Sequence, residues 1–185
     1  MNDIQEHLNI LKQAQTSEIS FEEAERKLIK MYWKSNKATK ENIINIFSCV
    51  KPRKEAFELI NYLKAKGYGI FFISGAIDIY VEKLSKDLGA DGYYANSKLE
   101  FDSKGILKKI HYRQEQSKIK LKQLKELSQK EKIGIKSIVF IGDSENDIDV
   151  FKATNNGIAV LPADGNLIKK AWKTVKNLSE IKEIL

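Results

Sequence analysis

The stretch FIGDSENDIDVF, residues 140–151, decides the fold because an apolar run passes through an acidic loop into a helical pattern. The run over residues 137–141 is typical of a buried strand, and we expect a helix over residues 147–153. Apolar runs over residues 68–73 and 157–161 also precede helical patterns. Strands that alternate with helices predict an α/β fold, with a parallel sheet covered by helices on both faces.

The remaining sequence falls into two regions around this pattern. Residues 1–66 are helix after helix without a strand signal, which predicts a helical N-terminal region whose last helix leads into the following core. Residues 67–185 are expected to form the α/β core. Within the core we expect helices over residues 77–88, 116–130 and 167–172, and a β-hairpin with strands 98–102 and 106–110.

Composition limits the classes of function. The chain has 185 residues, a net charge of +7 and no apolar run near the roughly 20 residues that a membrane span needs. Of its 32 Lys and Arg residues only Arg26, Arg53 and Arg113 are Arg, which argues against specific nucleic-acid recognition. The N-terminus lacks the pattern of a signal or transit peptide, and Cys49 is the only cysteine, so we expect a cytoplasmic protein. The sequence does not predict its oligomeric state.

The first candidate site is Ser74-Gly75, at the expected end of the strand over residues 68–73. In parallel sheets, ligands bind at the carboxyl ends of the strands. A hydroxyl and main-chain N–H groups at the start of a helix can hold an anion such as phosphate. The alternative is an ordinary serine cap with a permissive glycine.

The second candidate site is the acidic loop after residue 141. Asp143 and Asp147 lie four residues apart where strand turns to helix, so their carboxylates can converge, and such oxygens suit Mg²⁺. A calcium-binding EF-hand loop is excluded, because Ile148 and Thr154 occupy the positions of the required glycine and glutamate. The alternative is a loop of acids that only cap a helix.

Lys118 opens the long helix over residues 116–130, just before the acidic strand. In so lysine-rich a chain a single lysine usually belongs to a solvated helix face. Lys118 gains meaning only in combination with Ser74-Gly75 and the acidic loop.

The three candidate segments, taken in chain order, resemble motifs two, three and four of the haloacid-dehalogenase (HAD) superfamily of phosphatases. These segments are Ser74-Gly75, Lys118 and Asp143–Asp147. The similarity to the phosphoserine-phosphatase-like branch extends over roughly residues 18–185. The resemblance implies a Rossmann-like parallel sheet with flanking helices. It also implies a small helical cap, which would be the helical region over residues 1–66 with its lead-in helix. It also implies a Mg²⁺-dependent hydrolase acting on a small phosphomonoester through an aspartyl-phosphate.

The resemblance also implies roles for single residues. Ser74 and the Gly75 N–H would hold phosphate oxygens, and Lys118 would neutralise their charge. Mg²⁺ would be anchored by Asp143 and Asp147, directly or through water, while Asn146 would orient the loop or contact the phosphate.

In the cap, the resemblance places Phe21 on the cap side of the pocket, although a buried Phe of a helical cap is the simpler interpretation. Phosphoserine phosphatases grip the substrate carboxylate with an Arg of the second cap helix. Leu28 occupies that position here, and Arg26 lies two residues earlier on another face, which weakens phosphoserine in particular and leaves another small phosphomonoester equally open.

One part of the family pattern is missing. Motif one is a central strand that ends in Asp-x-Asp and carries the nucleophile, whereas residues before Tyr68 have helix or turn patterns. The only Asp-x-Asp is Asp147-Ile148-Asp149, inside motif four. We therefore expect the chain as it stands to be inactive, and to be part of a phosphatase that begins upstream. The alternative is a non-catalytic truncated pseudophosphatase or phosphate-binding module.

Overall fold

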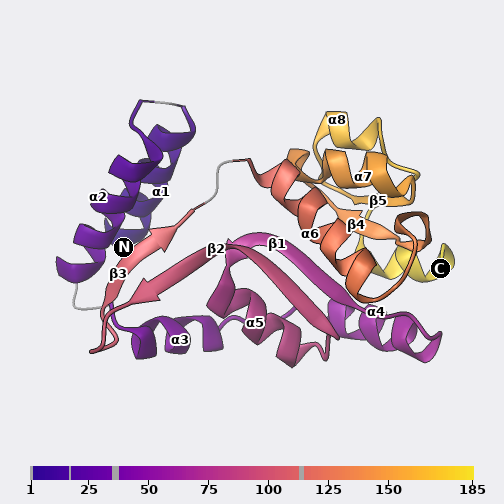
Figure 1. The fold of residues 1–185 in the computed structure, drawn as a ribbon, viewed down its shortest axis with the longest axis horizontal. Helices are drawn as coiled ribbons and strands as arrows, with labels where there is room; N and C mark the ends of the chain where they lie inside the picture. The colour runs from indigo at the N-terminus through magenta and orange to yellow at the C-terminus, as the bar shows by residue number, and fades with distance from the viewer. Residues whose placement is uncertain (1, 17, 35–37, 113–114) are drawn as a thin grey trace. The chain divides into compact units, whose positions relative to one another are not determined.

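The computed structural model describes residues 2–16, 18–34, 38–112 and 115–185 (Figure 1). The α-helices in chain order are α1 (Asn2–Gln15), α2 (Phe21–Lys34), α3 (Lys40–Ser48), α4 (Lys54–Ala65), α5 (Asp78–Asp87), α6 (Gln116–Lys130), α7 (Ile148–Thr154) and α8 (Gly165–Ile168). The strands are β1 (Phe71–Ile77), β2 (Gly92–Phe101), β3 (Leu107–His111), β4 (Phe140–Gly142), β5 (Gly157–Val160) and β6 (Lys173–Val175). Short 3₁₀ turns are η1 (Ile135–Ser137), η2 (Glu145–Asp147) and η3 (Leu178–Glu183).

The chain forms two compact units. The first consists of Met1–Lys51, Ile77–Tyr80 and Ser97–Tyr112, and the second of Pro52–Ala76, Val81–Asn96 and Arg113–Leu185. This division differs from a boundary after residue 66. The reason is that the β2–β3 hairpin packs on the N-terminal helices, where Leu99 and Leu107 share a core with Ile29 and Ala38.

The first unit combines the predicted N-terminal helices with the predicted hairpin. Helices α1 and α2 pack through small and branched side chains, including Ala14 and Leu28. Strands β2 and β3 are antiparallel. The Asp102 carboxylate fixes their turn by accepting hydrogen bonds from the main-chain N–H groups of Lys104, at 2.9 Å, and Ile106, at 2.8 Å.

The second unit contains the predicted parallel strands. Phe140 of β4 is paired with Gly157 of β5, and β5 is parallel to β6. Gly157 has no room for a side chain, because a Cβ there would overlap the fully buried ring of Phe151 on α7. On the opposite side, Ile158 belongs to a core formed with α4 and η3. Strand β6 was not predicted, because residues 173–175 are short and mostly exposed.

Strand β1 differs from its prediction in a way that matters for the site. We expected the strand to end at Ile73, but it runs on to Ile77, so Ser74 and Gly75 lie within it. Helix α5 begins only at Asp78. Ser74-Gly75 therefore precedes the helix by several residues and does not form its first turn.

The strands form two sheets, with the orders β1-β2-β3 and β4-β5-β6. The α/β class is confirmed, but β1 and β4 each end a sheet in the part of the chain that the structure describes. Their side chains are half-buried throughout, although both strands are rich in Phe and Ile.

Within the described ranges, no helix combines the length and the apolar character that crossing a lipid bilayer requires.

Candidate phosphate and metal site

Asp147 organises the acidic loop from a buried position. Its Oδ1 accepts a hydrogen bond from Lys120 Nζ at 2.6 Å. Its Oδ2 accepts from the main-chain N–H of Asp143, at 3.3 Å, and from both the N–H and the hydroxyl of Ser144, at 3.2 and 3.3 Å. Both carboxylate oxygens are therefore engaged, which makes this side chain the anchor of the loop.

Gly142 allows the main chain to approach that carboxylate. A Cβ at this position would overlap Asp147 Oδ2 and would lie only 2.7 Å from Asp147 Cγ. Since the carboxylate is held on both oxygens, it has little freedom to move away. The glycine before Asp143 is thus required by packing at this strand end.

Asp143 is placed differently from Asp147. The residue is exposed, and its carbonyl oxygen accepts a hydrogen bond from the Asp164 N–H at 2.9 Å, which ties the acidic loop to the segment before α8. Among the described residues, none has a recorded hydrogen bond or ion pair with the Asp143 carboxylate. This carboxylate is therefore available to a ligand from solvent.

The donor set fits Mg²⁺ in a limited sense. No group of three or more His, Cys, Asp or Glu side chains that could hold a metal occurs among the described residues. Mg²⁺ commonly keeps several waters and is bound through one or two carboxylates together with phosphate oxygens. Asp143 fits the role of such a carboxylate. Asp147, whose carboxylate is already bonded to Lys120 and to the loop, fits the role of a residue that holds the loop in place.

Lys118 does not reach the acidic loop. Its side chain is 72% exposed and pairs with Glu115, which raises the pKa of Lys118 above its ordinary value through that hydrogen bond and charge. The side chain of Lys120 is only 10% exposed and pairs with Asp147. Residues two apart on a helix point in nearly opposite directions, so only one of these lysines can face the loop.

The sequence does contain the signal for Lys120. Leu124 and Leu127 are buried on α6, and Lys120 lies one turn before Leu124 on the same face. An interpretation based on the first lysine of the helix misses this periodicity. The buried face of α6 begins with the polar residues Gln116 and Lys120 and continues with leucines.

Gly75, next to Ser74, lies close to the same face of α6. The Ser74 hydroxyl accepts a hydrogen bond from the Ala76 N–H at 3.1 Å. A Cβ at Gly75 would lie 3.0 Å from Gln116 Oε1, so the main chain passes close to the start of α6. Gln116 and Lys120 are one turn apart. Gln116 lies close to Gly75, and Lys120 bonds to Asp147. Helix α6 therefore connects the two predicted halves of the site.

For the remaining predicted site residues, no hydrogen bond or ion pair with the Lys120 or Asp147 side chain occurs among the residues that the structure describes. Asn146 is exposed within η2. Phe21 begins α2, but its side chain lies outside the part of the chain that the structure describes. Arg26 is exposed on α2, whereas Leu28 is buried in the helical core of the first unit.

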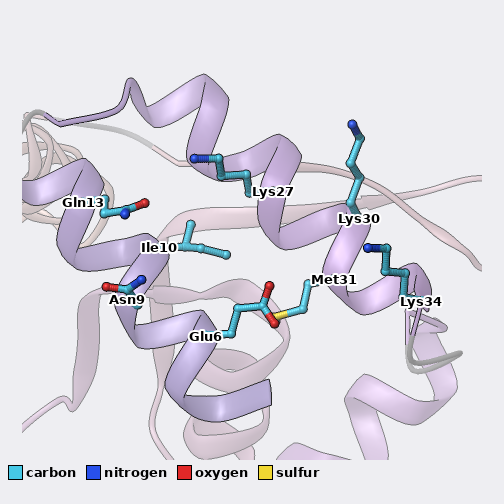
Figure 2. A pocket seen from close by; sticks show the side chains of 8 residues that line it. All are labelled: Glu6, Asn9, Ile10, Gln13, Lys27, Lys30, Met31 and Lys34. Carbon is cyan, nitrogen blue, oxygen red and sulfur yellow. The ribbon is translucent and has the colours of Figure 1, made fainter. Parts of the chain in front are cut away.

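A separate groove lies between α1 and α2 in the first unit and has a volume of about 580 Å³ (Figure 2). Its floor includes Ile10 and Met31, and Lys27, Lys30 and Lys34 line the α2 side. None of the predicted site residues whose side chains the structure describes lines this groove.

The fold agrees with comparisons with known proteins. The profile of the haloacid dehalogenase-like hydrolases matches residues 2–152, and the chain belongs to this family. Within the family, the chain is similar to phosphoserine phosphatases. That of Methanocaldococcus jannaschii is 29% identical over 150 residues, which are 81% of this chain and 69% of that protein.

Two further relatives agree. The phosphoserine phosphatase of Archaeoglobus fulgidus is 28% identical over 168 residues, which are 87% of this chain but only 48% of that protein. A solved structure of a phospho-aspartyl intermediate analogue of phosphoserine phosphatase superposes with a TM-score of 0.71 at 27% identity. That match covers 98% of this chain and 85% of the other.

Proposed function

We propose that this chain carries the phosphate-binding and Mg²⁺-binding part of a phosphomonoester hydrolase. The observation that supports it best is the buried Lys120–Asp147 pair, which places a cation beside the loop that presents Asp143. On the same face of α6, Gln116 meets the Ser74-Gly75 segment. An anion held between these two segments would be neutralised by Lys120 and by a metal on Asp143.

The roles of the residues follow from this arrangement. The Ser74 hydroxyl and the Gly75 N–H hold phosphate oxygens. Lys120, in place of the predicted Lys118, supplies the fixed positive charge. Asp143 would hold Mg²⁺, whose charge would help to neutralise the phosphate, and Asn146 would orient the loop or contact the phosphate.

In this proposal the nucleophile is supplied from outside the described residues that form the site. In the Asp147-Ile148-Asp149 sequence, Asp147 is engaged by Lys120, and Asp149 accepts a hydrogen bond from the Ser117 hydroxyl at 2.7 Å. We therefore propose that the attacking aspartate lies on a strand outside this chain. One of its carboxylate oxygens forms a bond to phosphorus while the ester P–O bond breaks. The second aspartate of the Asp-x-Asp sequence that ends this strand gives a proton to the leaving oxygen, which departs as the alcohol. Water then cleaves the aspartyl-phosphate and releases phosphate.

The substrate in this proposal is a small phosphorylated metabolite. The similarity to phosphoserine phosphatases supports phosphoserine. The burial of Leu28, at the position where that branch has a carboxylate-binding Arg, supports a different leaving group. Comparing phosphoserine with esters that lack a carboxylate decides between them.

The test is Mg²⁺-dependent release of phosphate from p-nitrophenyl phosphate. The unchanged chain is compared with the same chain preceded by an apolar strand that ends in Asp-x-Asp. We expect no turnover from the unchanged chain and turnover from the extended one. Phosphate binding without turnover in the extended protein would instead support a non-catalytic phosphate-binding module.

Asp143→Asn in the extended protein is expected to lower the rate by at least about 100-fold, because removing a group that stabilises transition-state charge commonly has this effect. The measurement is the steady-state rate as Mg²⁺ is titrated. Glu145→Gln is the matched control, because Glu145 is exposed in the same loop. Equal rates in the Asp143 and Glu145 variants would refute the role of Asp143.

A further inference from the structure

Two buried amides lie where β2 meets the start of α6. Asn96 Nδ2 donates a hydrogen bond of 2.6 Å to Gln116 Oε1. Asn96 is 3% exposed and Gln116 is 6% exposed. Burying two amides carries a desolvation cost, and only a fully paired arrangement offsets it. Here Asn96 Oδ1 is buried without a hydrogen-bond partner among the described residues, so the pair is not optimised for stability alone.

Gln116 is also the point where α6 approaches the phosphate-binding segment. Its Oε1 lies 3.0 Å, and its Cδ 3.6 Å, from the place of a Cβ on Gly75. The Gly75 main chain is therefore packed directly against this amide. A change in the rotamer of Gln116 would open or close the space beside Gly75.

Lys120 lies one helical turn after Gln116 and is held by Asp147. A rigid turn of helix therefore separates the residue that touches Gly75 from the residue that supplies the positive charge. The Asn96 hydrogen bond restrains the amide of Gln116 and thereby restrains the distance between these two parts of the site.

We propose that Gln116 is a positioning residue that sets Gly75 relative to Lys120, and that Asn96 acts through Gln116 by fixing its amide. This inference rests on the proposed function, since it concerns the same phosphate-binding site. It predicts that loss of either amide weakens phosphate binding in a folded protein.

The experiment measures the affinity of the unchanged chain and its variants for inorganic phosphate with Mg²⁺, by ³¹P NMR titration. Gln116→Met keeps the length of the side chain and removes its acceptor. Asn96→Leu keeps the size of the side chain and removes its donor. Each should weaken phosphate binding about tenfold, in line with the loss of one buried hydrogen-bond partner.

The double variant separates positioning from general destabilisation. Because Asn96 acts through Gln116, the double variant should bind phosphate no more weakly than Gln116→Met alone, whereas independent effects would add. Gln123→Met is the matched control, since Gln123 also has a buried, unpartnered Oε1 on α6 but lies further along the helix. It should leave phosphate affinity unchanged. Thermal unfolding of each variant identifies those that are folded at the titration temperature.

Several outcomes decide the inference. It is overturned if the folded Gln116 or Asn96 variant binds phosphate like the Gln123 control, or if the two effects add. If the unchanged chain itself binds no phosphate, the proposed function fails and the inference falls with it. These results are distinguishable, because in the first case the unchanged chain still binds phosphate.

Discussion

Lys120→Met is expected to lower the free energy of unfolding by about 3–5 kcal/mol, the usual cost of removing one partner of a buried ion pair. The substitution leaves the Asp147 carboxylate buried without its cation, although the loop N–H groups still donate to its Oδ2. Urea denaturation followed by circular dichroism measures the loss. Phosphate binding should be lost as well, because the fixed positive charge of the site is removed.

Lys118→Met is the matched control on the same helix. Lys118 is exposed and pairs with Glu115 one turn away, and exposed ion pairs contribute little to stability. We therefore expect its urea midpoint to match that of the unchanged chain. If both variants lose stability and phosphate affinity equally, the assignment of Lys120 is wrong.

Gly157→Ala is expected to lower the free energy of unfolding by about 3 kcal/mol, at the upper end of the range for substitutions that overpack a core. The added Cβ would overlap the Phe151 ring, which is fully buried and packed against Phe140 with ring centroids 6.2 Å apart. The main chain cannot withdraw freely, because the Gly157 carbonyl accepts a hydrogen bond from the Trp172 N–H at 2.8 Å. The measurement is again the urea midpoint.

Two further variants test that explanation. Gly165→Ala places the same methyl group on α8, where nothing lies within 4 Å of the new Cβ, and it should leave stability unchanged or slightly raised. The double variant Phe151→Leu with Gly157→Ala should lose less stability than the two single variants lose together, because the smaller side chain at residue 151 leaves space for the new methyl group. Strict additivity would show that the ring is not the obstacle.

The fold was largely predictable because its signals are local. Helix α6 has the predicted bounds, β5 lies close to its predicted position, and the hairpin was predicted, although β2 begins at Gly92, six residues before the predicted start. Periodicity and turn residues determine such elements within a few residues of sequence. The extension of β1 through Ser74-Gly75 was not predictable in the same way, because a serine and a glycine normally signal the end of a strand.

The motifs of the candidate site were proposed from the sequence, but the lysine that bonds to the acidic loop was not. The acidic loop and Ser74-Gly75 follow from residue type and strand position, whereas the choice between Lys118 and Lys120 depends on which face of α6 is buried. The amide pair of Asn96 and Gln116 was also missed. It joins residues 20 apart on different elements, and no local pattern reports such a contact.

The ends of the two sheets have a consequence for handling the isolated chain. In the described part of the protein, β1 and β4 each have one edge without a partner strand, and their aromatic side chains are only half-buried. Such edges are templates for intermolecular strand addition. Copies of this chain should therefore self-associate as concentration rises, and light scattering will detect this before any loss of secondary structure. A strand that pairs with either edge should suppress this association.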